Sequence, residues 1–334
     1  MDGVTSTTTQ PAAYLEAQRD VAALAAEVRA SAARLARAQW EVMDHATPGH
    51  RGAEVIDPEA LVLLSLWLAP HDRALVRTLH AWVARWSDLL SVQRTRNIAR
   101  IFPPEVLPAL HALAQTAYQK GKDFRWAPIL RGGAAVSGPH DGDENGSTAS
   151  VLAAPGARLA SARSGLLVLR LRMAFGVGAR ADAVAFLLAR GESWSTVTGI
   201  AHATGYTPSA IRRALDRMAE AKIVLMLDDG TTRYRCEQAP WAALLALPHA
   251  VTPWRYWLQR FVFATAFATW AAGVTQRKLT AYAIAEQCRQ LARGVHVTDD
   301  PEAQRAWKQA FADGSTLGEM MSAVRGVTDL LRLA

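Results

Sequence analysis

The sequence holds few of the residues on which disulfide-stabilised folds and metal sites depend. Cysteine occurs only twice in 334 residues, as Cys236 and Cys288. Two cysteines exclude a disulfide framework, and neither has a partner at the spacing of a zinc site. The nine histidines are scattered, and the nearest pair, His45 and His50, flanks a Pro-Gly loop instead of sharing one helix face. We therefore expect neither a metal nor a cofactor.

Long hydrophobic runs are also missing. The longest apolar stretch without charge, Phe261 to Val274, is shorter than the roughly 20 residues that a bilayer-spanning helix needs. The first residues are polar and contain no apolar segment of the kind found in a signal peptide. We expect a cytoplasmic protein with no membrane partner, in which Phe261 to Val274 belongs to a buried helix.

Recognisable catalytic motifs are absent as well. Gly176-Val-Gly178 is only a fragment of the dinucleotide-binding glycine pattern, and neither Gly-x-Ser-x-Gly nor His-Glu-x-x-His occurs. The acidic pairs Asp228-Asp229 and Asp299-Asp300 are typical of a turn and of a helix cap. The sequence therefore favours a protein that is not an enzyme.

The residues that are abundant predict a mainly α-helical, basic protein. Half of the residues are hydrophobic, with alanine and leucine prominent, and the formal net charge is +7. The length is enough for two or three domains. A basic balance favours polyanionic partners. A coding sequence rich in G and C would produce the same alanine- and arginine-rich composition, so charge alone decides nothing.

Changes in composition along the chain predict its organisation. Residues 1–10 resemble a disordered tail, and residues 11–131 a helical domain that opens with a long amphipathic helix over 11–44. Asp57 followed by proline marks the start of another helix. Residues 132–165 are rich in Gly, Ser, Ala and Pro and predict a flexible linker. Further helices are expected over 61–68, 71–90, 92–101 and 104–118.

A third segment, residues 166–237, separates the linker from a second helical domain over 238–334. Its first residues, Leu166 to Met173, alternate apolar side chains with arginine and predict a strand. A helix is expected from about Arg180 to Ala189. The carboxyl-terminal domain is expected to contain helices at about 257–273, 279–292, 301–312 and 317–333.

The most informative part of the chain is residues 194–236. Thr198 is expected to cap a short helix, and Gly205 fits a tight corner after it because glycine adopts positive φ at little cost. Thr207 is expected to cap the next helix, with Pro208 at its first position, where a missing N–H costs nothing. Helical spacing predicts that this second helix buries Ile211, Leu215 and Met218.

The opposite face of that second helix carries Arg212, Arg213 and Arg217, and a hairpin with an Asp-Asp-Gly turn follows it. A short helix, a glycine corner, an arginine-bearing helix and a hairpin together resemble a winged helix-turn-helix of the kind found in MarR-like regulators. The resemblance covers about a fifth of the chain, the central segment only. With the helical patterns before and after it, we expect a mainly α fold in which helical domains stand on either side of a winged helix.

What the resemblance implies about function is double-stranded DNA binding, as in a bacterial transcriptional regulator that acts as a homodimer or in a larger assembly. Arginine binds phosphate oxygens or the guanine edge with two parallel hydrogen bonds. The arginine helix would enter a groove and the hairpin, or wing, would hold the adjacent backbone. The candidate DNA-binding residues are Thr198, Thr207, Ser209, Arg212, Arg213, Arg217, Thr231, Thr232, Arg233 and Arg235.

Two other functions fit the same residues. Large helical flanks around a small winged helix also suit a protein-interaction subunit of a defence or chromosome-handling system, or an antitoxin, with or without DNA binding. A ligand-responsive sensor is the third possibility, because aromatic residues of the carboxyl-terminal domain could line an apolar pocket. These aromatic residues are Trp254, Tyr256, Trp257, Phe261, Phe263 and Trp270.

Overall fold

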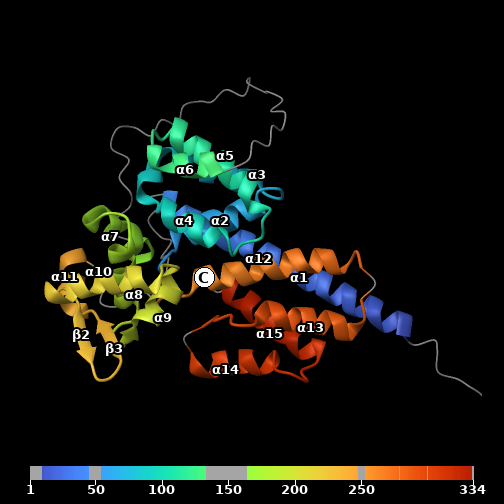
Figure 1. Ribbon diagram of the computed structural model, residues 1–334. Helices are drawn as coiled ribbons and strands as arrows, with labels where there is room; N and C mark the ends of the chain where they lie inside the picture. The colour runs from blue at the N-terminus through green and yellow to red at the C-terminus, as the bar shows by residue number, and fades with distance from the viewer. Residues whose placement is uncertain are drawn as a thin grey trace, which may run out of the picture.

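The computed structural model describes residues 10–44, 54–132, 164–246, 253–277, 279–298 and 300–332, and it is mainly α-helical (Figure 1). Residues 1–9 of the expected disordered tail and residues 133–163 of the expected linker lie outside the described residues, and Gln10 is the first residue of α1. The amino-terminal helices are α1 (Gln10–Asp44), α2 (Pro58–Leu68), α3 (Arg73–Trp86), α4 (Val92–Ala99), α5 (Val106–Gln119) and α6 (Ala127–Gly132). The carboxyl-terminal helices are α12 (Trp257–Val274), α13 (Ala281–Ala292), α14 (Pro301–Ala310) and α15 (Leu317–Arg332).

A central unit with a small sheet follows the amino-terminal helices in the sequence and precedes the carboxyl-terminal ones. Its helices are α7 (Leu167–Phe175), α8 (Ala179–Ala189), α9 (Val197–Thr204), α10 (Pro208–Glu220) and α11 (Gln238–Leu245). Its strands are β1 (Ser195–Thr196), β2 (Leu225–Asp228) and β3 (Thr232–Arg235). All three strands are antiparallel, with β3 in the middle: β1 pairs Thr196 with Arg233, and β2 pairs Leu227 with the same residue. The central unit has its own buried cluster of apolar side chains.

Local signals set most helix starts. The side chain of Asp57 accepts a hydrogen bond from the Ala60 N–H, with Pro58 at the first position of α2, as predicted. The side chain of Asp300 caps α14 in the same way, also with proline at the first position. The expected helix over 71–90 ends earlier, at Trp86, and Ser87–Leu89 continues it as a 3-10 turn.

The prediction of a strand from Leu166 to Met173 is wrong, because these residues form the end of a 3-10 turn and most of α7. Leucine, arginine and methionine are good helix formers, and only one residue of the stretch, Val168, is β-branched. The alternating pattern led to a wrong prediction, because the strand interpretation required both Arg170 and Arg172 to face solvent. In fact Arg172 is fully buried in ion pairs.

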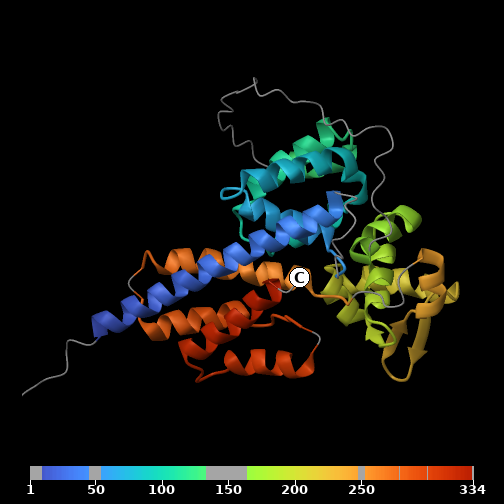
Figure 2. The ribbon, with the colours of Figure 1, turned by 180° about the vertical axis from the view of Figure 1, so that it is seen from behind.

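The two ends of the chain share one core. The long helix α1 packs against both α12 and α15, which Figure 2 shows from behind. Hydrogen bonds join the same ends of the chain: from α1, the Gln18 side chain donates to the Val274 carbonyl at 3.1 Å, and from α2, the Trp67 indole donates to the Thr269 hydroxyl of α12 at 3.2 Å. One buried cluster thus takes in residues from the ranges expected as an amino-terminal and a carboxyl-terminal domain. We call these helices, α1–α6 and α12–α15, the helical body.

The apolar residues of α12 are core residues. Trp257 stacks on Phe261, and Phe263 packs edge-on against Trp307 of α14 with ring centroids 4.9 Å apart. Trp257, Phe261 and Phe263 are each at most 2% exposed. Of the aromatic residues considered for an apolar ligand pocket, only Tyr256 lines a cavity described below.

In the described part of the chain, none of the helices combines the length and the apolar character that crossing a bilayer demands.

Candidate nucleic-acid interface

Two capped helices meet at a glycine in the central unit. The short helix α9 is capped by Thr196, whose hydroxyl accepts from the Gly199 N–H at 3.1 Å. The prediction that Thr198 is the cap is therefore wrong by two residues. Ser195 and Thr196 form the strand β1, which no local pattern indicates, and α9 begins directly after it. Thr198 is exposed in the first turn. The cap by Thr207 and the first-position Pro208 of α10 are confirmed.

Gly205, between these two helices, is needed for two reasons. Its φ of +73° lies in the left-handed region, as predicted for the corner. A Cβ at this position would also stand 2.9 Å from Ile98 Cγ2 of α4 and 2.9 Å from Leu258 Cδ2 of α12. The corner is thus pressed against the helical body, and only a residue without a side chain permits that approach.

We expect Gly205→Ala to destabilise the protein more than Gly191→Ala. Gly191 has a φ of +62°, but its Cβ would meet nothing within 4 Å, so it serves as a matched control for the backbone term alone. The left-handed conformation costs alanine about 1–2 kcal/mol, and overpacking at Gly205 adds about 1–3 kcal/mol. Urea denaturation measures both variants. Equal losses of unfolding free energy would show that the approach to Ile98 and Leu258 does not matter.

Helix α10 has one buried and one exposed face. The predicted stripe of Ile211, Leu215 and Met218 is buried in the core of the central unit. The opposite face leaves Ser209, Arg212, Arg213 and Arg217 exposed. Asp216 lies between the faces, where it accepts a hydrogen bond from the Tyr234 hydroxyl of β3 and so fastens the helix to the sheet.

The arginines of this face keep their charge available. Within the described ranges, Arg212, Arg213 and Arg217 form no salt bridge with a carboxylate. Arg180, from the first turn of α8, lies with Arg213 and Arg217 around a groove of about 520 Å³ next to the glycine-containing turn between α7 and α8. A free guanidinium has five N–H donors for an incoming anion. The groove thus collects positive charge from two helices.

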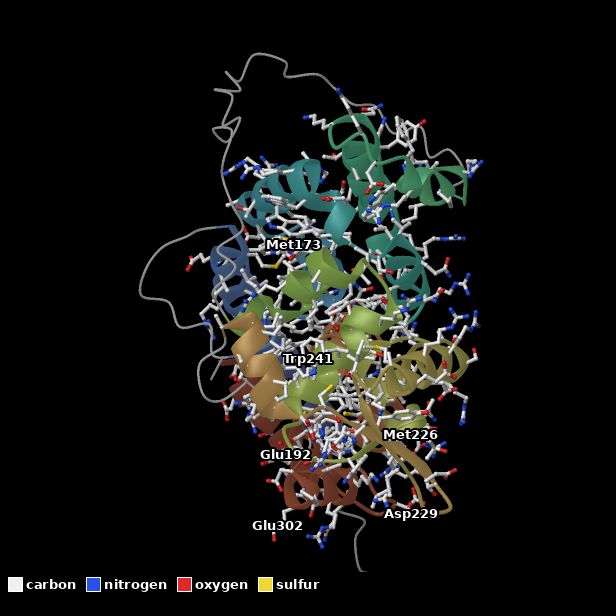
Figure 3. All side chains as sticks on the ribbon, turned by 90° about the vertical axis from the view of Figure 1, so that its left-hand side faces the viewer. Met173, Glu192, Met226, Asp229, Trp241 and Glu302 are labelled. Atoms are coloured by element: carbon white, nitrogen blue, oxygen red, sulfur yellow. The ribbon has the colours of Figure 1, made fainter. Side chains whose placement is uncertain are left out.

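The hairpin of β2 and β3 carries its own arginines, but both already have acidic partners. The predicted strands and turn are confirmed, and Figure 3 shows Asp229 at the tip and Met226 on one edge. Arg233 pairs with Asp229, and Arg235 pairs with Glu192 at 2.8 Å while stacking over the Trp194 ring. Thr231 in the turn is exposed, and Thr232 is half-buried. An anion would have to compete with Asp229 and Glu192 for these two guanidinium groups.

A buried ion cluster joins the central unit to the helical body. Arg94 of α4 forms two parallel hydrogen bonds of 2.6 Å with the Asp57 carboxylate and a third, of 2.5 Å, with Glu59. Arg172 of α7 binds Glu59 on one side and Asp182 of α8 on the other, with shortest N–O distances of 2.6 Å to each. These five side chains are at most 3% exposed.

The same cluster reaches the corner between α9 and α10. Arg94 Nε donates to the Thr204 carbonyl at 2.5 Å, just before Gly205. The Tyr206 hydroxyl, just after it, donates to Asp182 at 3.0 Å. Because both flanks of the corner are bonded to buried ions, α10 is held in a fixed orientation relative to α2, α4 and α8. Arg94 is 110 residues from Thr204 in sequence, Asp57 and Glu59 are farther still, and no local pattern connects these three residues with the corner.

Glu59 stays ionised in this cluster. Burial alone would raise its pKa, but Arg172 and Arg94 outweigh burial and lower the pKa to about 2. The Ser91 N–H also donates to this carboxylate, at 2.7 Å. A carboxyl whose pKa is lower in the folded than in the unfolded protein stabilises the fold above the unfolded pKa and loses that contribution as pH falls towards the folded value.

We therefore expect acid to weaken the protein through Glu59 between about pH 4.5 and about pH 2. The contribution at neutral pH is on the order of 3 kcal/mol, at about 1.36 kcal/mol for each pKa unit. Urea denaturation of the protein and of Glu59→Gln at a series of pH values isolates this contribution. The variant should be less stable at pH 7 and should lose less stability in acid. Parallel pH profiles of the two proteins would contradict the assignment.

Sequence reasoning placed Thr207, Ser209, Arg212, Arg213 and Arg217 on one exposed surface, and the structure brings them together on α10 and its cap. It missed Arg180, whose only signal was its position at the start of a predicted helix. It also missed Arg94 and Glu59, because charged residues in a sequence are expected at the surface. No family model, no curated protein and no solved structure matches this chain.

Proposed function

We propose that α8 to β3 form a winged helix-turn-helix and that the protein binds double-stranded DNA with it, as a transcriptional regulator without catalytic activity. The observation that carries the proposal is the exposed face of α10, where Arg212, Arg213 and Arg217 have no carboxylate partner in the described part of the chain. The order of the helices and strands along the chain and the strand order of the sheet, β1-β3-β2, also support the proposal. In this proposal α10 enters the major groove, which is about 12 Å wide.

The candidate residues would contribute to DNA binding to different degrees. Arg212, Arg213 and Arg217 would contact base edges or phosphates, and Arg180 would extend the contact to a neighbouring phosphate. Ser209 and Thr207 sit at the first turn of α10, where the helix dipole favours a phosphate. Arg233 and Arg235 would contribute less, because each must first leave its carboxylate.

Fluorescence anisotropy with the full-length protein tests the proposal. Duplexes selected from a random library, and the duplex upstream of the protein's own coding sequence, are titrated at two salt concentrations with unrelated duplex as competitor. A regulator retains binding against the competitor, and its affinity falls with salt in proportion to the phosphates that it contacts. Weak binding that vanishes with salt and shows no preference among duplexes would refute sequence-specific binding.

A second candidate function, docking of a protein partner or of a second copy, is favoured by one observation. On the central unit the apolar side chains of Leu244 and Ile223 are 70% and 39% exposed, and they border a small pocket of about 170 Å³ at the base of the hairpin. Exposed apolar groups that lie close together are typical of interaction sites. Analytical ultracentrifugation of the protein and of Leu244→Ser tests whether copies associate through this face.

A further inference from the structure

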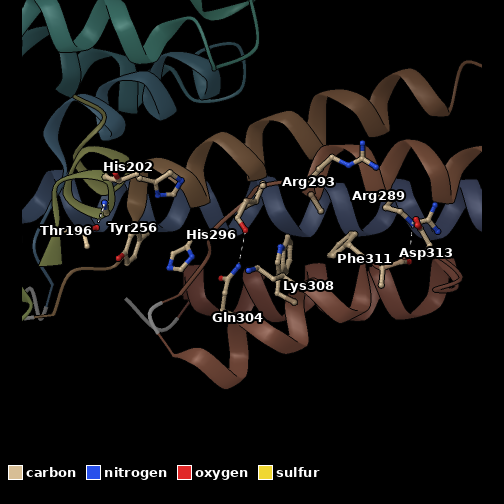
Figure 4. Close-up of a pocket in the computed structure, with 17 residues that line it drawn as sticks. Thr196, His202, Tyr256, Arg289, Arg293, His296, Gln304, Lys308, Phe311 and Asp313 are labelled. Atoms are coloured by element: carbon tan, nitrogen blue, oxygen red, sulfur yellow. Dashed lines mark hydrogen bonds and ion pairs between the residues drawn. The ribbon is translucent and has the colours of Figure 1, made fainter. Parts of the chain in front are cut away.

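A cleft lies between the central unit and the helical body. Its volume is about 800 Å³, within the range of about 300–1,000 Å³ typical of small-molecule sites. One wall comes from Thr198 and His202 of α9 and the other from the end of α13 and from α14 (Figure 4). None of the residues proposed to bind DNA contributes to it except Thr198.

One end of the cleft is lined by rings. His202 of α9 faces His296, in the segment after α13, with ring centroids 6.0 Å apart, and Tyr256 packs edge-on against His296 at 4.8 Å (Figure 4). Burial lowers the pKa of His202, which keeps its imidazole neutral at pH 7. Imidazole and phenol rings offer flat surfaces together with hydrogen-bond donors and acceptors. This end therefore suits a planar, polar ring such as a nucleobase.

The other end of the cleft is cationic. Arg293 and Lys308 line it, both are exposed, and neither forms a salt bridge within the ranges that the structure describes. Arg289 also lines this end but is already occupied, since it pairs with Glu286 and donates to the Ala312 carbonyl. Asp313 is the only carboxylate among the described lining residues, and its side chain is fully exposed. Two free cations beside a cavity favour a phosphate group.

From these two ends we infer that the cleft binds a nucleotide-like ligand, with its ring packed against His202 and His296 and its phosphates on Arg293 and Lys308. The site is distinct from the face of α10. Its walls belong to α9 and to α13–α14, so an occupied cleft would connect the helix before α10 to the helical body. A change in DNA affinity on ligand binding would follow only if the proposed DNA binding is correct, whereas ligand binding itself does not depend on it.

Isothermal titration calorimetry of the full-length protein with ADP tests the inference, with adenosine and inorganic pyrophosphate as fragments. We expect ADP to bind with Kd below about 1 mM and each fragment to bind more weakly. Because a hydrogen bond to a charged group contributes about 1.5–3 kcal/mol, each of Arg293→Ala and Lys308→Ala should weaken ADP binding about tenfold or more. Arg305→Ala is the control, since Arg305 is an exposed arginine on α14, the helix that carries Lys308, and does not line the cleft.

Four results would overturn the inference. The first is that ADP does not bind, and the second is that ADP binds Arg293→Ala and Lys308→Ala as tightly as it binds the unmodified protein. Pyrophosphate binds as tightly as ADP, which would leave an anion site with no role for the rings. Finally, the two variants could lose affinity for duplex DNA as Arg213→Ala does while ADP does not bind. The cleft would then be part of the DNA-binding surface. Retention of ADP binding by a protein that binds no DNA would support the cleft and refute only the proposed function.

Discussion

Replacing Arg172 with leucine is expected to lower the free energy of unfolding by about 3–5 kcal/mol, the cost of leaving buried charge without its partner. Arg172 binds Glu59 and Asp182 together and also donates to the Leu89 carbonyl at 2.8 Å. Without it, three buried carboxylates would share the single positive charge of Arg94. The loss should exceed that of any exposed arginine because water cannot reach the cluster.

Arg170, two residues earlier on α7, provides the matched control. It is half-buried and donates to the Leu245 carbonyl, but it has no carboxylate partner in the described part of the chain. Arg170→Leu should cost about 1 kcal/mol. If Arg172→Leu does not fold, Arg172→Lys keeps the charge but cannot bridge both carboxylates, and an intermediate loss is expected. Equal urea midpoints for the variants at positions 170 and 172 would contradict a role for the cluster in stability.

The double variant Arg212→Ala/Arg213→Ala is expected to abolish preferential DNA binding while leaving the fold intact. Both side chains are exposed on α10 and form no salt bridge in the described ranges, so their removal leaves no buried partner. An arginine that contacts a base contributes about 1–3 kcal/mol, so the double variant should bind the selected duplex roughly a hundredfold more weakly. If both contact phosphates instead, the loss is similar for every duplex and the salt slope falls by about 0.9 for each contact.

Arg77→Ala is the control for net charge, because Arg77 is an exposed arginine on α3 of the helical body. Anisotropy titrations at two salt concentrations compare the proteins, and thermal melting verifies that each variant is folded. The proposal predicts that Arg77→Ala binds DNA almost as tightly as the unmodified protein. If Arg77→Ala and the double variant weaken binding equally, the attraction is that of net charge and α10 has no special role.

The caps and stripes of the helices could be predicted from the sequence because their physical causes are local. Asp57, Thr207 and Gly205 act on backbone groups within a few residues, so their effect is contained in the residue type and its neighbours. The exposed face of α10 follows from helical spacing in the same way. The strand at Leu166 to Met173 failed as a prediction because its pattern depended on where Arg172 points, which distant residues decide.

The sequence by itself thus determined a mainly helical chain, the hairpin, and a helix with arginines on one side. Only the tertiary structure decided that α1 joins α12 and α15 in one core, that Arg94 and Arg172 are buried, and that Arg180 lies beside α10. It also decided which cations are free and which are paired, and formed the cleft between α9 and α14. These features depend on side chains far apart in sequence, whose meeting no local pattern encodes.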